Sequence, residues 1–274
     1  MADGEKRSEA KAQARLRGES LFAFTEHRIH AFESRRGYQK VVMRFLDWCR
    51  ERQNVCDHQQ IDARADELAT LYLTERMGQH YSASTLTTER SALRMYFQDR
   101  SLAVRVALPK RKREDIVRSR KPAVRDTHIN LANWQHVIRF CLACGLRREE
   151  LRDLCVRDVY HRPSDGQLVV HVCRGKGGKD RKVPVFPGRE QAVLSAVAGK
   201  AADDHVFDRV SGLLDIQSYR RQFAQELYEH LSGRPLPPLE GRLPSAEVDL
   251  DVALYVSRCL GHNRLDIIFG SYIR

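Results

Sequence analysis

No hydrophobic run in the sequence approaches the roughly 20 residues that a membrane-spanning helix requires. The first twenty residues are polar and charged, and they lack the apolar stretch of a secretory signal peptide. The seven cysteines are an odd number, which in a chain without an export signal argues against a disulfide framework. These absences predict a cytoplasmic protein with reduced thiols.

Complete metal and nucleotide motifs are also missing. The one suggestive spacing, Cys141-Leu-Ala-Cys144, has no second cysteine pair or histidine cluster to complete a zinc site. We predict that both are core cysteines, with metal or redox chemistry as the weaker alternative, and we expect no metal ligands. The GKGGK stretch at 175–179 lacks the spacing of a phosphate-binding P-loop, so no nucleotide or other cofactor is expected.

Positive charge, by contrast, is in excess. The 274 residues include 47 Lys and Arg against 36 Asp and Glu, which gives a net charge of +11 and a pI near 9.5. A polyanion such as nucleic acid is therefore the first partner to consider. With 42% hydrophobic residues the chain has globular composition, and its length suits two domains.

The first half of the chain has helical periodicity. Residues 1–20 are predicted to form a mobile arm. After it, apolar residues recur at steps of three and four, as between Tyr38 and Cys49, and no strand pair is evident before residue 105. We therefore predict a small helical domain over 21–108, which is either a scaffold or a clamp on one face of a DNA duplex.

A basic linker is predicted over 109–126, PKRKREDIVRSRKPAVRD. Between Lys110 and Lys121 it carries seven basic and two acidic residues, a net charge of +5. Such a run is either a solvated surface or, between two domains of a basic protein, a segment that follows a phosphate backbone. The second interpretation is slightly favoured.

The composition changes again in the last part of the chain, 127–274. An amphipathic helix ends near Gly145, and β-branched runs at 167–173 and 182–186 flank a glycine-rich connection, the pattern of a hairpin. Helices follow, interrupted by a Pro- and Gly-rich loop at 232–249 that has no assigned role. The predicted fold is mainly α with a small antiparallel β-hairpin or sheet in the C-terminal domain.

Four stretches of this last part invite a joint interpretation: GLRREEL (145–151), CRGKGGKDRKVPV (173–185), QSYRRQFAQEL (217–227) and CLGHNRLDIIFGSYIR (259–274). Each motif alone is weak, but in this order they resemble the tyrosine recombinases, the phage-integrase-like site-specific DNA recombinases. The motif resemblance covers about 127–274. It implies a two-domain architecture, with a helical core-binding domain and a mixed α+β catalytic domain.

The resemblance also implies a set of catalytic residues. Strand cleavage by direct attack on a phosphodiester builds negative charge on the phosphate oxygens, and guanidinium groups suit that charge because they offer paired N–H donors. The nucleophile would be a tyrosine, the leaving 5′-oxygen would take its proton from a lysine on the hairpin loop, and a histidine would bind the phosphate. The matching residues are Arg147, Lys176, Arg220, His262 and Tyr272. For each, a packed or solvated structural role is the alternative.

A second set of residues is expected to contact DNA. The linker and the hairpin carry cations that the resemblance places along the phosphate backbone. These residues are Lys110, Arg111, Lys112, Arg113, Arg118, Arg120, Lys179 and Arg181.

The chain departs from the family pattern at three points. Gln217 and Arg221 replace the two usual histidines of the second arginine motif, and glutamine cannot act as an acid or base near neutral pH. His262 lies ten residues before Tyr272, one more than the usual spacing. Only two residues follow Tyr272, which leaves open whether the chain was shortened or its partner contact is made elsewhere.

The resemblance thus implies a recombinase or integrase of a mobile element that cuts and rejoins DNA through a 3′-phosphotyrosyl intermediate, without metal or ATP. The expected partner is double-stranded DNA, bound by a homotetramer on paired sites, with a monomer as the alternative without DNA. No membrane partner is expected, and the protein would join the nucleoid when DNA-bound. Two other functions remain open: relaxation of DNA by a type IB topoisomerase, and DNA binding without catalysis.

Overall fold

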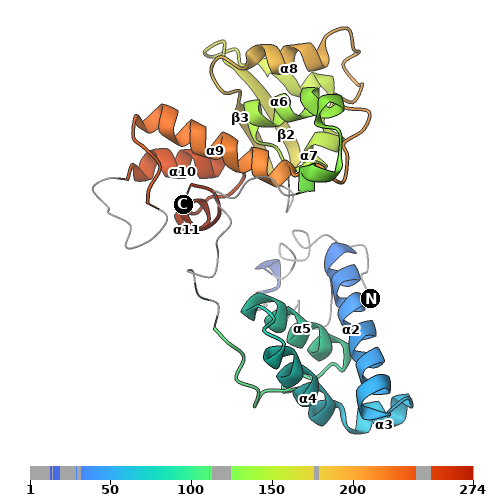
Figure 1. Cartoon of the computed structure of the whole chain (residues 1–274). Helices are drawn as coiled ribbons and strands as arrows, with labels where there is room; N and C mark the ends of the chain where they lie inside the picture. Colours follow the sequence, from blue (N-terminus) through green and yellow to red (C-terminus); the bar gives the residue numbers. More distant parts are fainter. Residues whose placement is uncertain are drawn as a thin grey trace. The chain divides into compact units, whose positions relative to one another are not determined.

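Two compact units make up the chain, Met1–Lys112 and Arg113–Arg274, and their boundary falls within the predicted linker. We describe each unit by itself (Figure 1). The computed structural model describes residues 13, 15–18, 29, 32–110, 112, 125–175, 179–238 and 248–273, without the side chains of Arg174 and Lys179. Most of the predicted arm and linker, and part of the Pro-rich loop, lie outside these residues.

Helices dominate the described part of the first unit, as the periodicity predicts. They are α2 (Phe32–Gln53), α3 (His58–Ala63), α4 (Ala65–Gly78) and α5 (Ala83–Tyr96). Asp57 and Ser82 begin α3 and α5 because their side chains accept hydrogen bonds from the backbone N–H groups of Gln59 and Thr85. No helix in the described residues is long and apolar enough to cross a bilayer.

The core of this unit joins α2, α4 and α5. Phe45, Leu68, Tyr72 and Leu93 are among its fully buried side chains. The buried carboxylate of Glu89 on α5 links this helix to α4 and α2. It accepts hydrogen bonds from Arg76 at 3.1 and 2.8 Å and from Arg44 at 2.9 Å. Pairing of this kind is what allows a charged side chain to remain buried.

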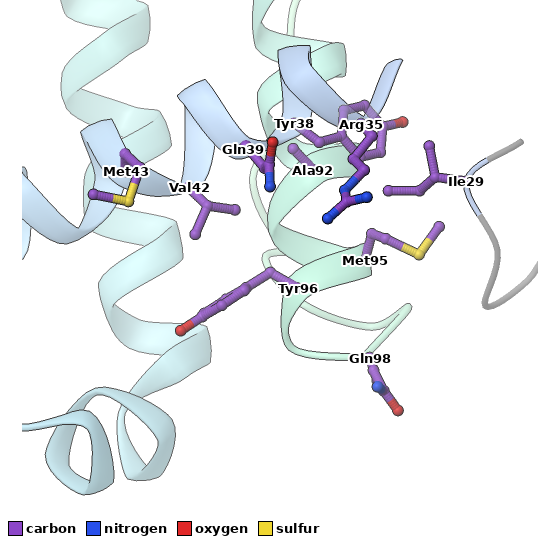
Figure 2. Close-up of a pocket in the computed structure, with 10 residues that line it drawn as sticks. All are labelled: Ile29, Arg35, Tyr38, Gln39, Val42, Met43, Ala92, Met95, Tyr96 and Gln98. Carbon is purple, nitrogen blue, oxygen red and sulfur yellow. The ribbon is translucent and has the colours of Figure 1, made fainter. Parts of the chain in front are cut away.

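A groove of about 630 Å³ lies between α2 and α5. Figure 2 shows that Val42 and Met43 of α2 border it together with Met95 and Tyr96 from the end of α5. None of the predicted catalytic residues lines this groove.

The second unit contains a small sheet covered by helices. Its strands are β1 (Val159–His161), β2 (Leu168–Gly175) and β3 (Lys179–Pro184), in the antiparallel order β1-β2-β3. Its α-helices are α6 (Gln135–Cys144), α7 (Arg148–Asp153), α8 (Glu190–Val197), α9 (Ile216–Ser232), α10 (Leu250–Cys259) and α11 (Leu265–Ser271), and short 3₁₀ turns are η2 (Arg125–His128), η3 (Leu131–Trp134) and η4 (Val156–Asp158).

The predicted hairpin is confirmed, with two differences. Backbone pairing extends into the glycine-rich connection, so that Gly175 pairs with Lys179 and only 176–178 remain between the strands. The hydrogen bonds between strands join main-chain groups, so charged side chains on the outer face of a strand do not interrupt the pairing. The strands therefore extend further into the connection than their side chains indicate. β1 was not predicted, because its three residues are too few for a period-2 pattern to be visible.

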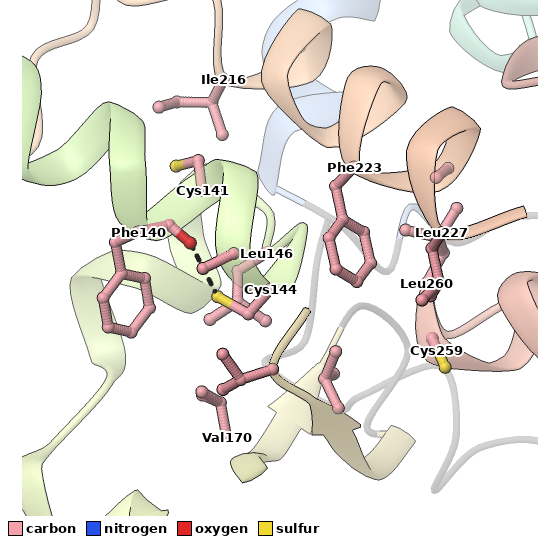
Figure 3. Packing of buried hydrophobic residues seen from close by; sticks show 14 of the residues in the cluster. Phe140, Cys141, Cys144, Leu146, Val170, Ile216, Phe223, Leu227, Cys259 and Leu260 are labelled. Atoms are coloured by element: carbon pink, nitrogen blue, oxygen red, sulfur yellow. Dashed lines mark hydrogen bonds between the residues drawn. The ribbon is translucent and has the colours of Figure 1, made fainter. Parts of the chain in front are cut away.

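The core of the second unit lies between α6, α9, α10 and the sheet. Figure 3 draws Phe140, Cys141 and Cys144 of α6 together with Phe223 of α9 and Leu260, all members of this core. Both cysteines are fully buried free thiols, which confirms the prediction of core cysteines, and burial raises the pKa of each thiol.

Gly145 ends α6 in the left-handed conformation, at φ +59. This conformation costs most residues about 1–2 kcal/mol because Cβ approaches the following carbonyl oxygen. The position also has no room, since a Cβ built there would overlap the ring of Phe223, which is fully buried. The turn that leads to Arg147 therefore requires glycine for two reasons: its left-handed backbone conformation and the lack of space beside Phe223.

We predict that Gly145→Ala lowers the free energy of unfolding of the second unit by about 2–4 kcal/mol, since overpacking adds to the backbone strain. Gly233→Ala is the matched control, because Gly233 has φ +63 but nothing within 4 Å of a built Cβ. It should cost about 1 kcal/mol from the backbone alone. Urea unfolding of both variants measures the difference, and equal losses would contradict the packing argument.

Candidate active site

Four of the five predicted catalytic residues lie together in the second unit. The Tyr272 hydroxyl is 3.2 Å from Arg220 Nε and 3.3 Å from His262 Nε2, and His262 Nε2 is 3.2 Å from Arg147 Nη2. The chain brings these groups together from the start of α7, from α9, from the turn after α10 and from the end of α11. Segments more than 100 residues apart therefore meet around one phenol.

Arg147 is positioned by the turn between α6 and α7. It is the extended residue that precedes α7, and its backbone N–H donates to Glu150 Oε2 at 2.8 Å. Its guanidinium donates to Glu150 Oε1 at 2.7 Å and to the Leu260 carbonyl at 3.0 Å. The side chain is thus fixed on one side by its own helix start and on the other by the turn that carries His262.

Arg220 is the largest fully buried side chain of the described residues. It lies one turn into α9, which Asp215 caps and Ile216 begins, and its guanidinium donates to the carbonyls of Gly145 and Leu260. These carbonyls belong to the ends of α6 and α10, where backbone acceptors have no partner within the helix. The helix ends therefore supply the acceptors that an arginine in a dry interior needs.

Glu150 is the shared counter-charge of this arginine cluster. Besides Arg147, it accepts hydrogen bonds from Arg181 at 3.0 and 2.6 Å, and it lies 3.9 Å from Arg220 Nη1. Burial acts to raise the pKa of Glu150, but the hydrogen bonds and positive charge of Arg181, with the Arg147 N–H and the charge of Arg220, lower the pKa to about 2. Glu150 is therefore ionised throughout the working pH range.

Arg181 is placed differently from what the sequence analysis expected. Its side chain is only 8% exposed and donates to Glu150 and to the Cys259 carbonyl, so it points into the domain and not toward a phosphate backbone. The physical reason is strand alternation, because Arg181 pairs with the buried Val172 and shares its inward face. Arg181 supports the cluster from inside the fold.

His262 follows a left-handed glycine, Gly261 at φ +71, which ends α10. Its backbone N–H donates to the Ser257 carbonyl at 2.8 Å, so the turn is closed on the helix. Because arginine can only donate, its contact with His262 Nε2 favours the tautomer in which Nε2 carries the lone pair. That lone pair also faces the Tyr272 hydroxyl.

The Tyr272 phenol is buried at 4% exposure and surrounded by donors. Gln217 Nε2 donates to its oxygen at 3.2 Å, as Arg220 does. Burial raises the pKa of the phenol, but the positive charge of Arg220, the hydrogen bonds from Arg220 and Gln217, and the charge of Arg147 outweigh it, so the net pKa lies below the ordinary value. The site can stabilise a phenolate and hold anionic oxygens next to it.

The remaining predicted residues, apart from Arg181, are either outside the described residues or exposed in the first unit. Lys176 lies outside the described residues, as do Arg111, Arg113, Arg118, Arg120 and the Lys179 side chain. Lys110 and Lys112 are exposed at the end of the first unit. Two residues gained a role that sequence reasoning did not give them: Gln217 donates to the phenol, and Glu150 is the shared partner of three arginines.

Residues 23–100 match the family described as phage integrase, N-terminal SAM-like domain. The XerH site-specific recombinase, solved with a palindromic difH substrate in a post-cleavage complex, is 14% identical with a TM-score of 0.51, and the match covers 98% of this chain and 82% of that one. The chain has the tyrosine recombinase fold.

A Tn1549 transposon integrase solved with circular intermediate DNA is also similar, at 15% identity and a TM-score of 0.49, over 98% of this chain and 95% of that one. No curated protein matches the chain by sequence. The tyrosine recombinase resemblance in the motifs is thus matched by the fold of the whole chain and by the domain at 23–100.

We predict that Glu150→Gln destabilises the second unit by about 3–5 kcal/mol near neutral pH, because it leaves buried guanidinium groups without their counter-charge. Since the folded pKa lies below the ordinary 4.5, the carboxylate stabilises the fold above about pH 4.5, and this stabilisation, about 3 kcal/mol, is lost as pH falls toward 2. The difference in the free energy of unfolding between the unaltered protein and Glu150→Gln should therefore become smaller as the pH is lowered.

Urea unfolding at a series of pH values measures this gap. Glu149→Gln is the matched control, since Glu149 is the preceding residue and its pair with Arg152 is exposed. The control should change the free energy of unfolding by less than about 0.5 kcal/mol. A pH-independent gap for Glu150→Gln would contradict the depressed pKa.

Proposed function

We propose that the protein is a site-specific DNA recombinase or integrase of a mobile element, which cuts and rejoins DNA through a 3′-phosphotyrosyl intermediate. The observation that carries the proposal is the cluster in which a Tyr272 phenol of lowered pKa lies within hydrogen-bond distance of Arg220 and His262. A buried terminal aromatic that only packs on a core would not need three polar partners around its hydroxyl.

Cleavage would proceed by attack of the Tyr272 oxygen on the scissile phosphorus. A bond forms between this oxygen and phosphorus while the bond from phosphorus to the 5′-oxygen breaks. The phenol proton passes to His262 Nε2, whose lone pair faces it, and the leaving 5′-oxygen takes a proton from Lys176. The phosphodiester is conserved as a phosphotyrosyl link, so rejoining by a second 5′-hydroxyl needs no ATP.

Arg147 and Arg220 would stabilise the charge that develops on the non-bridging oxygens. In the structure Arg220 Nε and His262 Nε2 are directed at the phenol oxygen itself. Phosphate binding therefore requires Tyr272 to give up part of these contacts, and the remaining arginine donors stay on the carbonyls of Gly145 and Leu260. The chain's own cations supply the charge stabilisation in this mechanism.

Double-stranded DNA is the proposed partner, bound by the helical first unit, the basic linker and the second unit, and four protomers on paired sites are the proposed assembly. The net charge of +11 supports a polyanionic partner. The XerH and Tn1549 proteins were themselves solved with DNA. Relaxation of plasmid without exchange between sites would instead indicate topoisomerase activity.

A binding protein without catalysis is the other alternative, because Gln217 and Arg221 stand where the family has histidines. Gln217 weakens this alternative, since it keeps a hydrogen bond to the nucleophile even though it cannot transfer a proton. Because Gln217 stands where the family has a histidine, His262 supplies the imidazole of this cluster.

We predict that Tyr272→Phe abolishes covalent capture of a nicked suicide duplex containing the element's ends, while salt-sensitive binding of that duplex is retained, because only the attacking oxygen is removed. Denaturing gel electrophoresis detects the protein–DNA adduct. Tyr255→Phe is the matched control: Tyr255 is 43% exposed on α10 and should leave adduct formation unchanged. An adduct with Tyr272→Phe would reject Tyr272 as nucleophile, and no adduct with the unaltered protein would favour the binding protein.

A further inference from the structure

A second cluster of polar side chains lies on the three-stranded sheet, and none of its members belongs to the proposed active site. Asp158 ends the turn before β1, His171 and Cys173 lie on β2, and Asp180 lies on β3. His171 and Cys173 are two residues apart and share one face of the sheet, opposite to the face of Val172, which is buried in the core. The cluster is therefore open to solvent on the outer face.

Three donor atoms of this cluster converge. Cys173 Sγ is 3.4 Å from Asp158 Oδ1 and 3.5 Å from His171 Nδ1, and the donor atoms of the three residues all lie within 4.8 Å of one another. Tetrahedral zinc with its usual bond lengths to sulfur, nitrogen and oxygen separates sulfur from either of the other ligand atoms by about 3.6 Å. The two observed separations from sulfur thus already match those around one ion.

The hydrogen bond between His171 and Asp180 provides an independent indication. Asp180 Oδ2 is 2.8 Å from His171 Nε2, and Cys173 Sγ is nearer to Nδ1, at 3.5 Å, than to Nε2, at 4.0 Å. Histidines that bind metals usually donate their other ring N–H to a carboxylate in this way, because it fixes the ring and its tautomer. Asp158 is also held, since its Oδ2 accepts from the Cys155 N–H at 3.0 Å.

We propose that Asp158, His171 and Cys173 bind a divalent transition-metal ion of borderline softness, with zinc as the test case, and that Asp180 orients His171. One thiolate, one imidazole and one carboxylate suit such an ion, whereas Mg²⁺ and Ca²⁺ prefer oxygen ligands alone. The exposed face leaves the fourth position to water. This site goes beyond the proposed strand transfer and does not depend on it.

The ion would join the segment before β1 to β2, and Asp180 would add β3 through its hydrogen bond. Cys173 precedes Lys176 by three residues, so the site lies near the end of β2 that leads into the connection with the predicted general acid. An ion bound here adds links between strands that the backbone ladder already pairs, and its binding free energy adds to folding stability.

The test is a titration of the untagged full chain with Co²⁺ alone, followed by displacement with Zn²⁺. We expect one equivalent of Co²⁺ to produce a thiolate-to-cobalt charge-transfer band, which Zn²⁺ abolishes. Cys173→Ser should lose the band, whereas Asp180→Asn should keep it but bind about tenfold more weakly, since it no longer presents a carboxylate to His171. The unfolding midpoint should rise with Zn²⁺ in the unaltered protein and not in Cys173→Ser.

Cys56→Ser is the matched control, because Cys56 is the other exposed cysteine and lies in the first unit. It should leave the band and its stoichiometry unchanged. The proposed metal site is overturned if the unaltered protein shows no thiolate band, if the band survives Cys173→Ser, or if Cys56→Ser removes the band. Unchanged Co²⁺ affinity in Asp180→Asn would overturn the orienting role of Asp180. Each outcome can be obtained without DNA, so it is separable from the test of Tyr272.

Discussion

A single buried carboxylate allows the arginine cluster of the second unit to exist. Arg147, Arg181 and Arg220 all direct guanidinium groups toward Glu150, and without it their like charges would repel in an environment with little water to screen them. Glu150 also begins α7 by accepting the Arg147 N–H. The same side chain therefore determines where a helix starts and where positive charge is concentrated.

Backbone carbonyls at helix ends complete the arrangement. The Leu260 carbonyl accepts from both Arg147 and Arg220, and the Cys259 carbonyl accepts from Arg181. The turn that presents His262 is consequently the turn that holds the arginines, and a change in one alters the position of the other. Left-handed glycines make these turns possible by ending the helices abruptly.

The ten-residue spacing from His262 to Tyr272 illustrates how a departure from a family pattern is absorbed. The short helix α11 occupies most of that interval, and Tyr272 follows it as the residue that ends the helix. Its hydroxyl still reaches His262 Nε2, and its carbonyl accepts from Gln225 at 2.7 Å. With a spacing of ten residues from His262 to Tyr272, the phenol still lies in the cluster.

The sequence by itself determined the helical first unit, the hairpin, the buried cysteines and the residue types of the site, because periodicity, turn residues and motif order are properties of short segments. It did not determine the direction of Arg181. That residue belongs to a basic stretch, and only strand register decides whether its side chain faces solvent or Glu150. The meeting of Asp158 with Cys173, and of Arg147 with His262, was likewise decided by the tertiary structure, since distances between remote segments depend on how helices and strands pack.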